Sequence, residues 1–336
     1  MQAAYIEEFG PPKVIRYGEL APPRIGPCDV LVRVQAVAVN GIDAYIRSGA
    51  YPVNSAMPFI IGRDLVGTVV DTGREVARFR AGDAVWANNQ GYDGRQGSFS
   101  EYCAVGQDLL YPLPEGADPL QTVAVVHSAL TAVLGLQHKA RLEPGETVFI
   151  NGGAGNVGTA ALGIAKALGA RVAVTTGQQD KAEWCLGLGA DLVINYRTRN
   201  VLDALREFAP EGVDVYFDTT RHFDGELAVA SMAQRGRILV IAGLTSETLL
   251  PVGRFYQRNA AMYGFTVTGA TTQELASYAG EINRWLAQGV VPARIAACLP
   301  LSQAAEAHRR LEAGGLFGKL VLTTEGVGHG DCREAG

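Results

Sequence analysis

The sequence lacks the features that mark secreted, membrane-spanning and nucleic-acid-binding proteins. Its five cysteines are odd in number and scattered without a CxxC pair, which favours reduced thiols over a disulfide framework or a zinc knuckle. There is no charged-then-apolar leader at Met1 and no apolar stretch of about 18 residues, so we expect a cytoplasmic protein. The net charge of −5 argues against nucleic acid as the main partner.

The first part of the chain is rich in β-strand signals. Val30–Val39 is β-branched with partial alternation, and similar short runs follow it, interrupted by glycine and proline without helical runs between them. This pattern predicts an antiparallel, barrel-like domain. Near its end, Asp118 is placed to cap a long helix through about Gln137, with Pro119 in the first turn.

Strands and helices alternate in the middle of the chain, as in Thr147–Ile150, Val157–Leu168 and Val172–Thr176. This alternation predicts βαβ units and a parallel sheet covered on both faces. With 336 residues, two domains are the default. The expected layout is a catalytic domain made of residues 1–125 and 268–324, a cofactor domain of residues 126–267 inserted into it, and a flexible polar tail of residues 325–336.

A glycine-rich loop joins the first of these strands to its helix. Gly152, Gly155 and Gly158 are spaced as GxxGxxG, close to the dinucleotide-binding fingerprint. Glycines let the backbone approach a pyrophosphate, and the helix amino terminus offers N–H groups to it. A tight βα turn is the alternative interpretation, but the flanking strand and helix favour dinucleotide binding.

The end of the second strand indicates which dinucleotide is bound. NAD enzymes usually carry an acid there for the ribose 2′-hydroxyl, whereas this strand ends in Thr176-Gly177 without a carboxylate. Gly177 leaves room for a 2′-phosphate, Lys181 follows one helical turn later, and Tyr196 can donate a further hydrogen bond. The sequence therefore favours NADPH, although Lys181 also fits a solvated surface lysine.

Several segments together resemble one family. Asn40–Gly49 followed by Tyr51 is similar to the NPxDxYxRxGxY signature of zeta-crystallin-type, zinc-free quinone oxidoreductases of the medium-chain dehydrogenase/reductase superfamily. Ile61–Gly67 (IGRDLVG) is similar to the PGxDxxG segment, with Ile in place of Pro. The similarity also covers the glycine loop, Ile194–Arg197, Ser302–His308 and Gly318–Leu322, and so almost the whole chain to about Thr323.

The resemblance implies an α/β fold in which a Rossmann-type parallel-sheet domain is inserted into a GroES-like β-barrel catalytic domain, with the active site in the interdomain cleft. It implies that Asn40, Tyr45 and Thr131 line the nicotinamide and substrate pocket, with Tyr51 beside the acceptor. His222 stands where relatives often have Asn. The implied cofactor contacts are Asn40, Tyr45, Thr131, Gly152, Ala154, Gly155, Asn156, Val157, Gly177, Lys181, Tyr196, Ile241, Ala242, Gly243, Leu244, Phe265, Thr266, Val267 and Lys319.

The zinc-dependent relatives need three side-chain ligands at the catalytic metal. This sequence has Asn40 or Gly41 in place of the family's cysteine, and Arg63–Asp64 in place of its His-Glu pair. His127 stands near the third position, and Asn88–Tyr102 contains none of the four closely spaced cysteines of a structural zinc lobe. We therefore expect no metal.

Without a metal, reduction of an activated acceptor is favoured over oxidation of simple alcohols. We expect an NADPH-dependent quinone oxidoreductase in which Tyr45 orients the acceptor oxygen and relays a proton, with water as the alternative donor and packing as the alternative role of Tyr45 and Tyr51. A reductase of α,β-unsaturated carbonyls or enoyl thioesters is the rival enzyme. A non-catalytic NADPH-binding structural or regulatory protein is the alternative of another class.

The remaining polar candidates have plainer interpretations. His127 fits a satisfied interior histidine, Asp43 a turn cap, and Asp64 a partner of Arg63 or of another cation. The late strand Ala261–Val267 is expected at the edge of the cofactor sheet. Because relatives join two sheets at this edge, we expect a homodimer.

Overall fold

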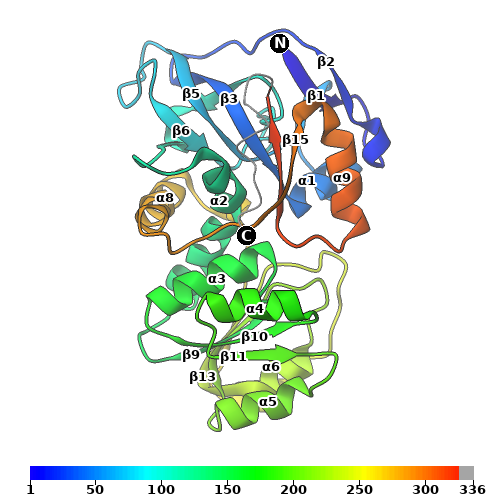
Figure 1. The fold of residues 1–336 in the computed structure, drawn as a ribbon, viewed down its shortest axis with the longest axis vertical. Coiled ribbons are helices and arrows are strands. Elements are labelled where there is room, and N and C mark those ends of the chain that lie inside the picture. Colours follow the sequence, from blue (N-terminus) through cyan, green and yellow to red (C-terminus); the bar gives the residue numbers. More distant parts are fainter. Residues whose placement is uncertain (325–336) are drawn as a thin grey trace. The chain divides into compact units, whose positions relative to one another are not determined.

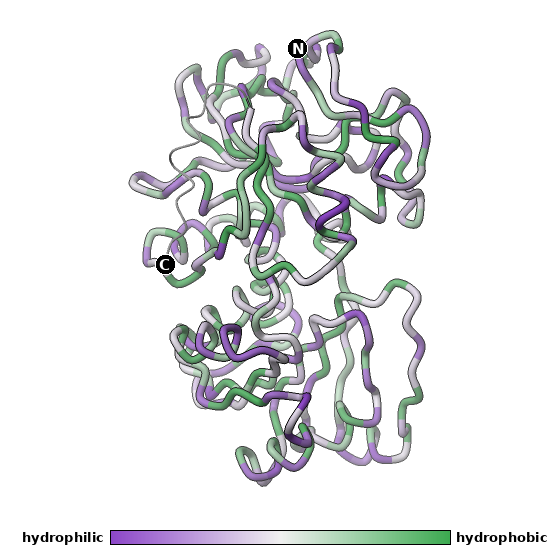
Figure 2. The backbone as a smooth tube through the Cα atoms, turned by 45° about the vertical axis from the view of Figure 1, so that its right-hand side comes forward, coloured by the Kyte–Doolittle hydropathy of each residue, from purple (hydrophilic) through white to green (hydrophobic). Residues whose placement is uncertain are grey.

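A computed structural model describes residues 1–324, and the tail predicted for residues 325–336 lies outside the described residues. The chain forms two compact units (Figure 1). The first contains residues 1–127, 270–287 and the described residues from 293 onward, and the second contains residues 128–269 and 288–292. Hydrophobic stretches occur within both units (Figure 2), as expected if each has its own core.

The first unit is built on a mostly antiparallel sheet with the order β15-β16-β3-β5-β6-β8, in which β7 also pairs with β3, and on a small sheet β2-β1-β4. Its strands are β1 (Gln2–Ile6), β2 (Arg16–Glu19), β3 (Asp29–Val39), β4 (Phe59–Ile60), β5 (Leu65–Thr72), β6 (Ala84–Ala87), β7 (Tyr102–Gly106), β8 (Leu110–Pro112), β15 (Ile295–Pro300) and β16 (Lys319–Thr323). Its helices are α1 (Gly41–Ser48), α8 (Thr272–Ala287) and α9 (Ala304–Ala313), with short 3-10 turns η1 (Pro12–Val14), η2 (Gln107–Leu109) and η5 (Leu301–Gln303).

Strand β3 shows why this sheet forms. Its valines at 30, 32 and 34 are buried in alternation, as the sequence pattern predicts, and the strand is buried throughout from Ala36 to Val39. Its neighbour β5 approaches so closely that a Cβ on Gly67 would lie 2.2 Å from the carbonyl oxygen of Arg33. A glycine is therefore required where the two strands meet.

The second unit is a parallel sheet with the order β11-β10-β9-β12-β13-β14. Its strands are β9 (Thr147–Asn151), β10 (Arg171–Thr176), β11 (Leu192–Asn195), β12 (Val213–Asp218), β13 (Met232–Val240) and β14 (Ala261–Gly264). Its helices are α3 (Asn156–Ala167), α4 (Gln179–Gly187), α5 (Val201–Phe208), α6 (Gly225–Ser231) and α7 (Val252–Gln257), with the 3-10 turn η4 (Val267–Gly269). The strand order reverses between β9 and β12, as in doubly wound dinucleotide-binding folds, so the predicted parallel sheet is confirmed.

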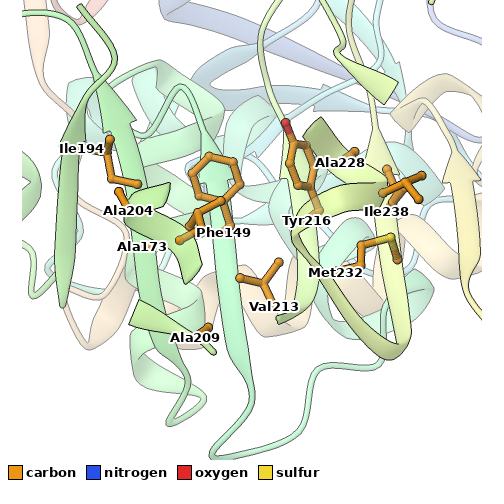
Figure 3. Packing of buried hydrophobic residues seen from close by; sticks show 12 residues of the cluster. Phe149, Ala173, Ile194, Ala204, Ala209, Val213, Tyr216, Ala228, Met232 and Ile238 are labelled. Atoms are coloured by element: carbon orange, nitrogen blue, oxygen red, sulfur yellow. The ribbon is translucent and has the colours of Figure 1, made fainter. Parts of the chain in front are cut away.

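Helices cover both faces of the parallel sheet. Figure 1 shows α3 and α4 over one face and α5 and α6 over the other. Within the core, the rings of Phe149 and Tyr216 stack edge to face with centroids 5.0 Å apart, and Ala173, Ala204 and Ile238 pack around them (Figure 3). Full burial of a ring such as Phe149 stabilises the fold by about 1.5–3 kcal/mol.

A long helix, α2 (Pro119–Val133), begins in the first unit and ends in the second, and a π-helical turn, η3 (Leu134–Lys139), extends it. The Gln121 N–H donates to the Asp118 carboxylate at 2.7 Å, so the predicted cap is confirmed. In the described part of the chain, Pro119–Lys139 is the one helix long and apolar enough to cross a membrane. Because 83% of its most apolar window is buried inside the protein, it fits a core helix equally well.

Some expectations need correction. Ala261–Val267 is not a continuous strand, because β14 ends at Gly264 and a 3-10 turn follows. Cys28, Cys103 and Cys185 are free, but the expectation of reduced thiols is wrong for Cys298, which is disulfide-bonded.

Candidate active site

The glycine loop of the second unit is shaped by its own backbone. Gly152 is left-handed, with φ of +88°, and its N–H donates to the hydroxyl of Thr175 at 2.8 Å. A Cβ on Gly158 would lie 2.2 Å from the Gly152 carbonyl oxygen, so only glycine lets helix α3 start this close to the loop. Gly155 is the N-cap of α3 and provides no side-chain cap. The first N–H groups of the helix are therefore left to bind an anion.

The predicted cofactor residues of this loop lie together in the structure. Gly155 and Asn156 are exposed, and Ala154 and Val157 are half-buried, so the stretch that follows Gly152 is accessible to a ligand. At the neighbouring strand end, the Asn151 side-chain amide donates to Asp218 at 2.9 Å. Sequence reasoning missed Asp218, which holds the ends of β9 and β12 together where the strand order reverses.

Gly177 and Tyr196 meet at the ends of β10 and β11. A Cβ on Gly177 would lie 2.5 Å from the Tyr196 hydroxyl oxygen, and the Tyr196 N–H donates to the Thr176 carbonyl at 3.2 Å. Lys181 is half-buried in the first turn of α4, close after Gly177 in the chain. No carboxylate follows β10 before Asp180, so the strand end presents the Tyr196 hydroxyl, packed against Gly177, and no acid.

Two further predicted segments follow strands of the same sheet. Residues 241–244 come directly after β13, with Gly243 left-handed at φ +87°, and residues 265–267 come directly after β14. Phe265 packs with its ring centroid 6.4 Å from that of Phe217. His222 is exposed and its N–H donates to the Thr220 hydroxyl. Carboxyl ends of parallel strands share one edge, which is where dinucleotides bind in such sheets.

Thr131 is buried on α2.

In the first unit, Asn40 is the centre of a buried polar cluster. It caps α1, and its backbone N–H donates to Asp43 at 2.7 Å, which confirms the turn-capping role expected of Asp43. Its side-chain amide donates to Asp64 at 2.7 Å and accepts from the Lys319 ammonium at 2.6 Å. Lys319 reaches Asn40 because β16 pairs with β3, with Leu320 opposite Val39. The Asn40 amide is therefore held in one orientation.

Burial controls the charges of this cluster. Burial and the neighbouring Asp64 raise the pKa of Asp43 to about 7, and burial raises the pKa of Asp64 against the opposing effect of Lys319. Burial lowers the pKa of Lys319 despite both carboxylates. The pKa of His127 is lowered well below its ordinary value by burial and then by Lys319 and Arg63, so His127 is neutral at physiological pH.

The donor set does not fit the zinc site of the alcohol dehydrogenases. Asp64 accepts hydrogen bonds from Asn40 and Asn88, and His127 Nδ1 lies 3.1 Å from the Asn88 amide nitrogen. Among the described residues, no group of three His, Cys, Asp or Glu side chains is arranged to hold a metal. The positive charges of Lys319 and Arg63, both buried, would also oppose a dication here.

Tyr45 and Tyr51 lie in and just after α1. Both are half-buried, and the Tyr51 N–H donates to the Tyr45 carbonyl at 3.0 Å, which ties the two segments together. Sequence reasoning missed Asn88, Asn89 and Gln90, although three consecutive amides after an apolar strand are a signal for a polar site. All three are buried.

Comparisons with known proteins cover almost the whole chain. Two family models match, the alcohol dehydrogenase GroES-like domain over residues 26–115 and the zinc-binding dehydrogenase over residues 156–281. The chain is 30% identical to the quinone oxidoreductase of Mus musculus over 327 residues, 96% of this chain and 97% of the relative. It is similar to the Escherichia coli quinone oxidoreductase complexed with NADPH, with a TM-score of 0.86 and 27% identity over 96% of this chain and 100% of that one. It is also similar to a solved NAD-dependent alcohol dehydrogenase, with a TM-score of 0.86 and 29% identity over 96% and 99% of the two chains.

These matches confirm the expected fold class, a Rossmann-type unit combined with a GroES-like unit, which is that of the medium-chain dehydrogenases/reductases. Within that class, the chain belongs to the quinone oxidoreductase family, as the Asn40–Tyr51 segment indicates. It is an oxidoreductase.

Proposed function

We propose that the chain is an NADPH-dependent quinone oxidoreductase that works without a metal on a small-molecule acceptor in the cytoplasm. The observation that carries the proposal is the end of β10, where the Tyr196 hydroxyl packs against Gly177 and no acid is present to repel a 2′-phosphate. NADPH is the cofactor of the similar Escherichia coli structure. The similar NAD-dependent alcohol dehydrogenase makes the choice of cofactor a point to be measured.

The residues that hold NADPH follow from this assignment. The loop from Gly152 to Val157 and the start of α3 bind the pyrophosphate through backbone N–H groups. Gly177, Lys181 and Tyr196 surround the 2′-phosphate. Residues 241–244 and 265–267 line the nicotinamide ribose. The nicotinamide itself is contacted by Asn40, Tyr45, Thr131 and Lys319. The bound cofactor supplies the hydride.

The first unit's own residues orient the acceptor. Lys319 and Asp64 fix the Asn40 amide, so its position needs no reorganisation during turnover. The Tyr45 hydroxyl orients the acceptor oxygen and passes it a proton, and Tyr51 bounds the same pocket. Buried cations in place of metal ligands favour an acceptor that is already activated, such as a quinone.

A homodimer completes the proposal. Strand β14 is the edge of the parallel sheet and has no further strand partner in the described part of the chain. Leu249, Val252 and Tyr256, in and just before α7, are 81%, 63% and 65% exposed, and Met262 on the edge strand is 38% exposed. Apolar side chains beside an open strand edge favour pairing with a second copy. In sedimentation, the wild type should then have the mass of a dimer, and Met262→Lys should shift towards the mass of a monomer. A wild type that sediments as a monomer would reject the dimer.

An acceptor panel tests the reaction. NADPH consumption is followed with benzoquinone, phenanthrenequinone and a medium-chain enone. Fast turnover of the quinones supports the proposal. Turnover of the enone alone assigns the chain to the reductases of α,β-unsaturated carbonyls. Tight NADPH binding with no turnover of any acceptor indicates the non-catalytic, structural or regulatory alternative.

A further inference from the structure

Arg63, between β4 and β5, is a buried cation with unused hydrogen-bond donors. Its side chain is 1% exposed, and its Nη2 donates to the Asn89 side-chain oxygen. Its Nε and Nη1 are buried without a hydrogen-bond partner among the described residues. Buried guanidinium groups are normally paired, because each unmet charged donor costs more than a neutral one. The described residues therefore supply no acceptor for these two donors of Arg63.

The nearby carboxylates do not fill this role. The two oxygens of Asp64 accept from Asn40 and Asn88, and Asp43 accepts from the Asn40 backbone. Neither carboxylate forms an ion pair with Arg63 in the described part of the chain. Lys319 adds a second positive charge to the same cluster. Asp43 and Asp64 attract Arg63 electrostatically, but neither supplies a hydrogen-bond acceptor to its Nε or Nη1.

A second guanidinium approaches the same residue. Arg95 Nη2 donates to the Asn89 backbone carbonyl at 3.2 Å, and its Nε is also buried without a partner among the described residues. The side chain of Arg95 is 29% exposed, and its Nη1 lies 3.6 Å from the exposed carboxylate of Asp93. Tyr92 lies between them in the chain, with its ring 5.8 Å from Arg63 Cζ.

Asn89, which binds both arginines, has a left-handed backbone with φ of +67°. Residues other than glycine adopt this conformation rarely, and it is found where the surrounding structure imposes it, often at binding sites. Here it directs the side-chain oxygen of Asn89 to one guanidinium and its carbonyl to the other. Burial lowers the pKa of Arg63, and the like charge of Arg95 lowers it further.

We propose that Arg63 and Arg95 form a binding site for a carboxylate carried by the electron acceptor. The planar fork of an arginine matches the two oxygens of a carboxylate, and the bound anion would satisfy the unused donors and separate the two positive charges. This inference rests on the proposed function and narrows its substrate class to quinones or activated alkenes that bear a carboxylate.

Kinetics with a matched pair of acceptors test the proposal. Naphthoquinone carboxylate and its methyl ester are compared in the wild type, Arg63→Gln and Arg95→Gln. Each variant should lower kcat/KM for the carboxylate about tenfold or more beyond its effect on the ester. Arg74→Gln, which removes a charge that is 81% exposed in the same unit, is the control and should change neither value. Equal losses for the two acceptors would overturn the proposal.

Equilibrium binding separates this inference from the proposed function. Calorimetry without NADPH compares anthraquinone carboxylate with its neutral carboxamide, and the carboxylate should bind more tightly in the wild type but not in Arg95→Gln. Because the Arg95 side chain is only partly buried, Arg95→Gln keeps the test valid if Arg63→Gln does not fold. Preference for the carboxylate without any quinone turnover would reject the proposed function alone. Quinone turnover without that preference would reject the carboxylate site alone.

Discussion

Lys319 should stabilise the first unit in a way that depends on pH. Its ammonium is 4% exposed and donates to Asn40 at 2.6 Å. Lys319→Met removes that donor and leaves a buried amide oxygen unsatisfied, a cost of about 1–3 kcal/mol. It also removes one of the two buried positive charges, the other being Arg63, that attract both Asp43 and Asp64.

The sign of the pH effect follows from Asp43. Its pKa is raised to about 7 in the folded protein, above the value of 3.8 that the group has when unperturbed. Folding therefore favours the protonated carboxyl, and the stability linked to this group is lost as the pH rises from the lower value to the higher one. At about pH 6 most of Asp43 is neutral and needs no cation, whereas at about pH 8 it is charged and depends on Lys319. The variant should lose more stability at the higher pH.

Urea unfolding followed by tryptophan fluorescence measures this difference, because Trp86 is fully buried in the same unit. The control is Lys13→Met, which removes an exposed lysine of that unit. We expect a loss of at least about 1 kcal/mol for Lys319→Met at about pH 8, smaller at about pH 6, and almost none for the control. A loss that is equal at the two pH values, or larger at the lower one, would refute the reasoning.

Three further substitutions test the cofactor and acceptor sites. Gly177→Ala places a Cβ 2.5 Å from the Tyr196 hydroxyl oxygen, so it should weaken NADPH binding about tenfold in a fluorescence titration while changing NADH binding less; equal weakening would reject the phosphate site. Gly158→Ala places a Cβ 2.2 Å from the Gly152 carbonyl and should weaken both cofactors together; unchanged binding would show that α3 tolerates the shift. Tyr45→Phe should slow quinone turnover by about tenfold or more in a steady-state assay, and an unchanged rate would remove the hydroxyl from the mechanism.

The elements with strong local patterns were predictable from the sequence. The alternation in β3 and the alternating strands and helices from Thr147 onward identified both sheets, because periodicity reports which faces are buried. Helix α5 was missed although Asn200 caps it, accepting from the Asp203 N–H at 3.0 Å, and although its apolar residues fall on one face. Strand β13 begins earlier than predicted.

The site residues also divide into those that the sequence pattern brought together and those that only the tertiary structure brings together. Gly177 and Tyr196 were grouped correctly because β10 and β11 are neighbours in the sheet, with Thr176 opposite Asn195. The bond from Lys319 to Asn40 joins residues 279 positions apart, and it follows only from the pairing of β16 with β3. The approach of Arg63 and Arg95 to Asn89 depends on the left-handed backbone of Asn89, which no composition or spacing indicates.

One measurement tests the cofactor and metal assignments together. Benzoquinone reduction is measured with NADPH and with NADH, using protein that has been treated with EDTA and then freed of it. We expect kcat/KM to favour NADPH by about tenfold to a hundredfold, as one charge-assisted bond to the 2′-phosphate allows, with no change after chelation. Preference for NADH would contradict the site at Gly177, Lys181 and Tyr196, and activity lost to EDTA and restored by zinc would contradict the metal-free mechanism.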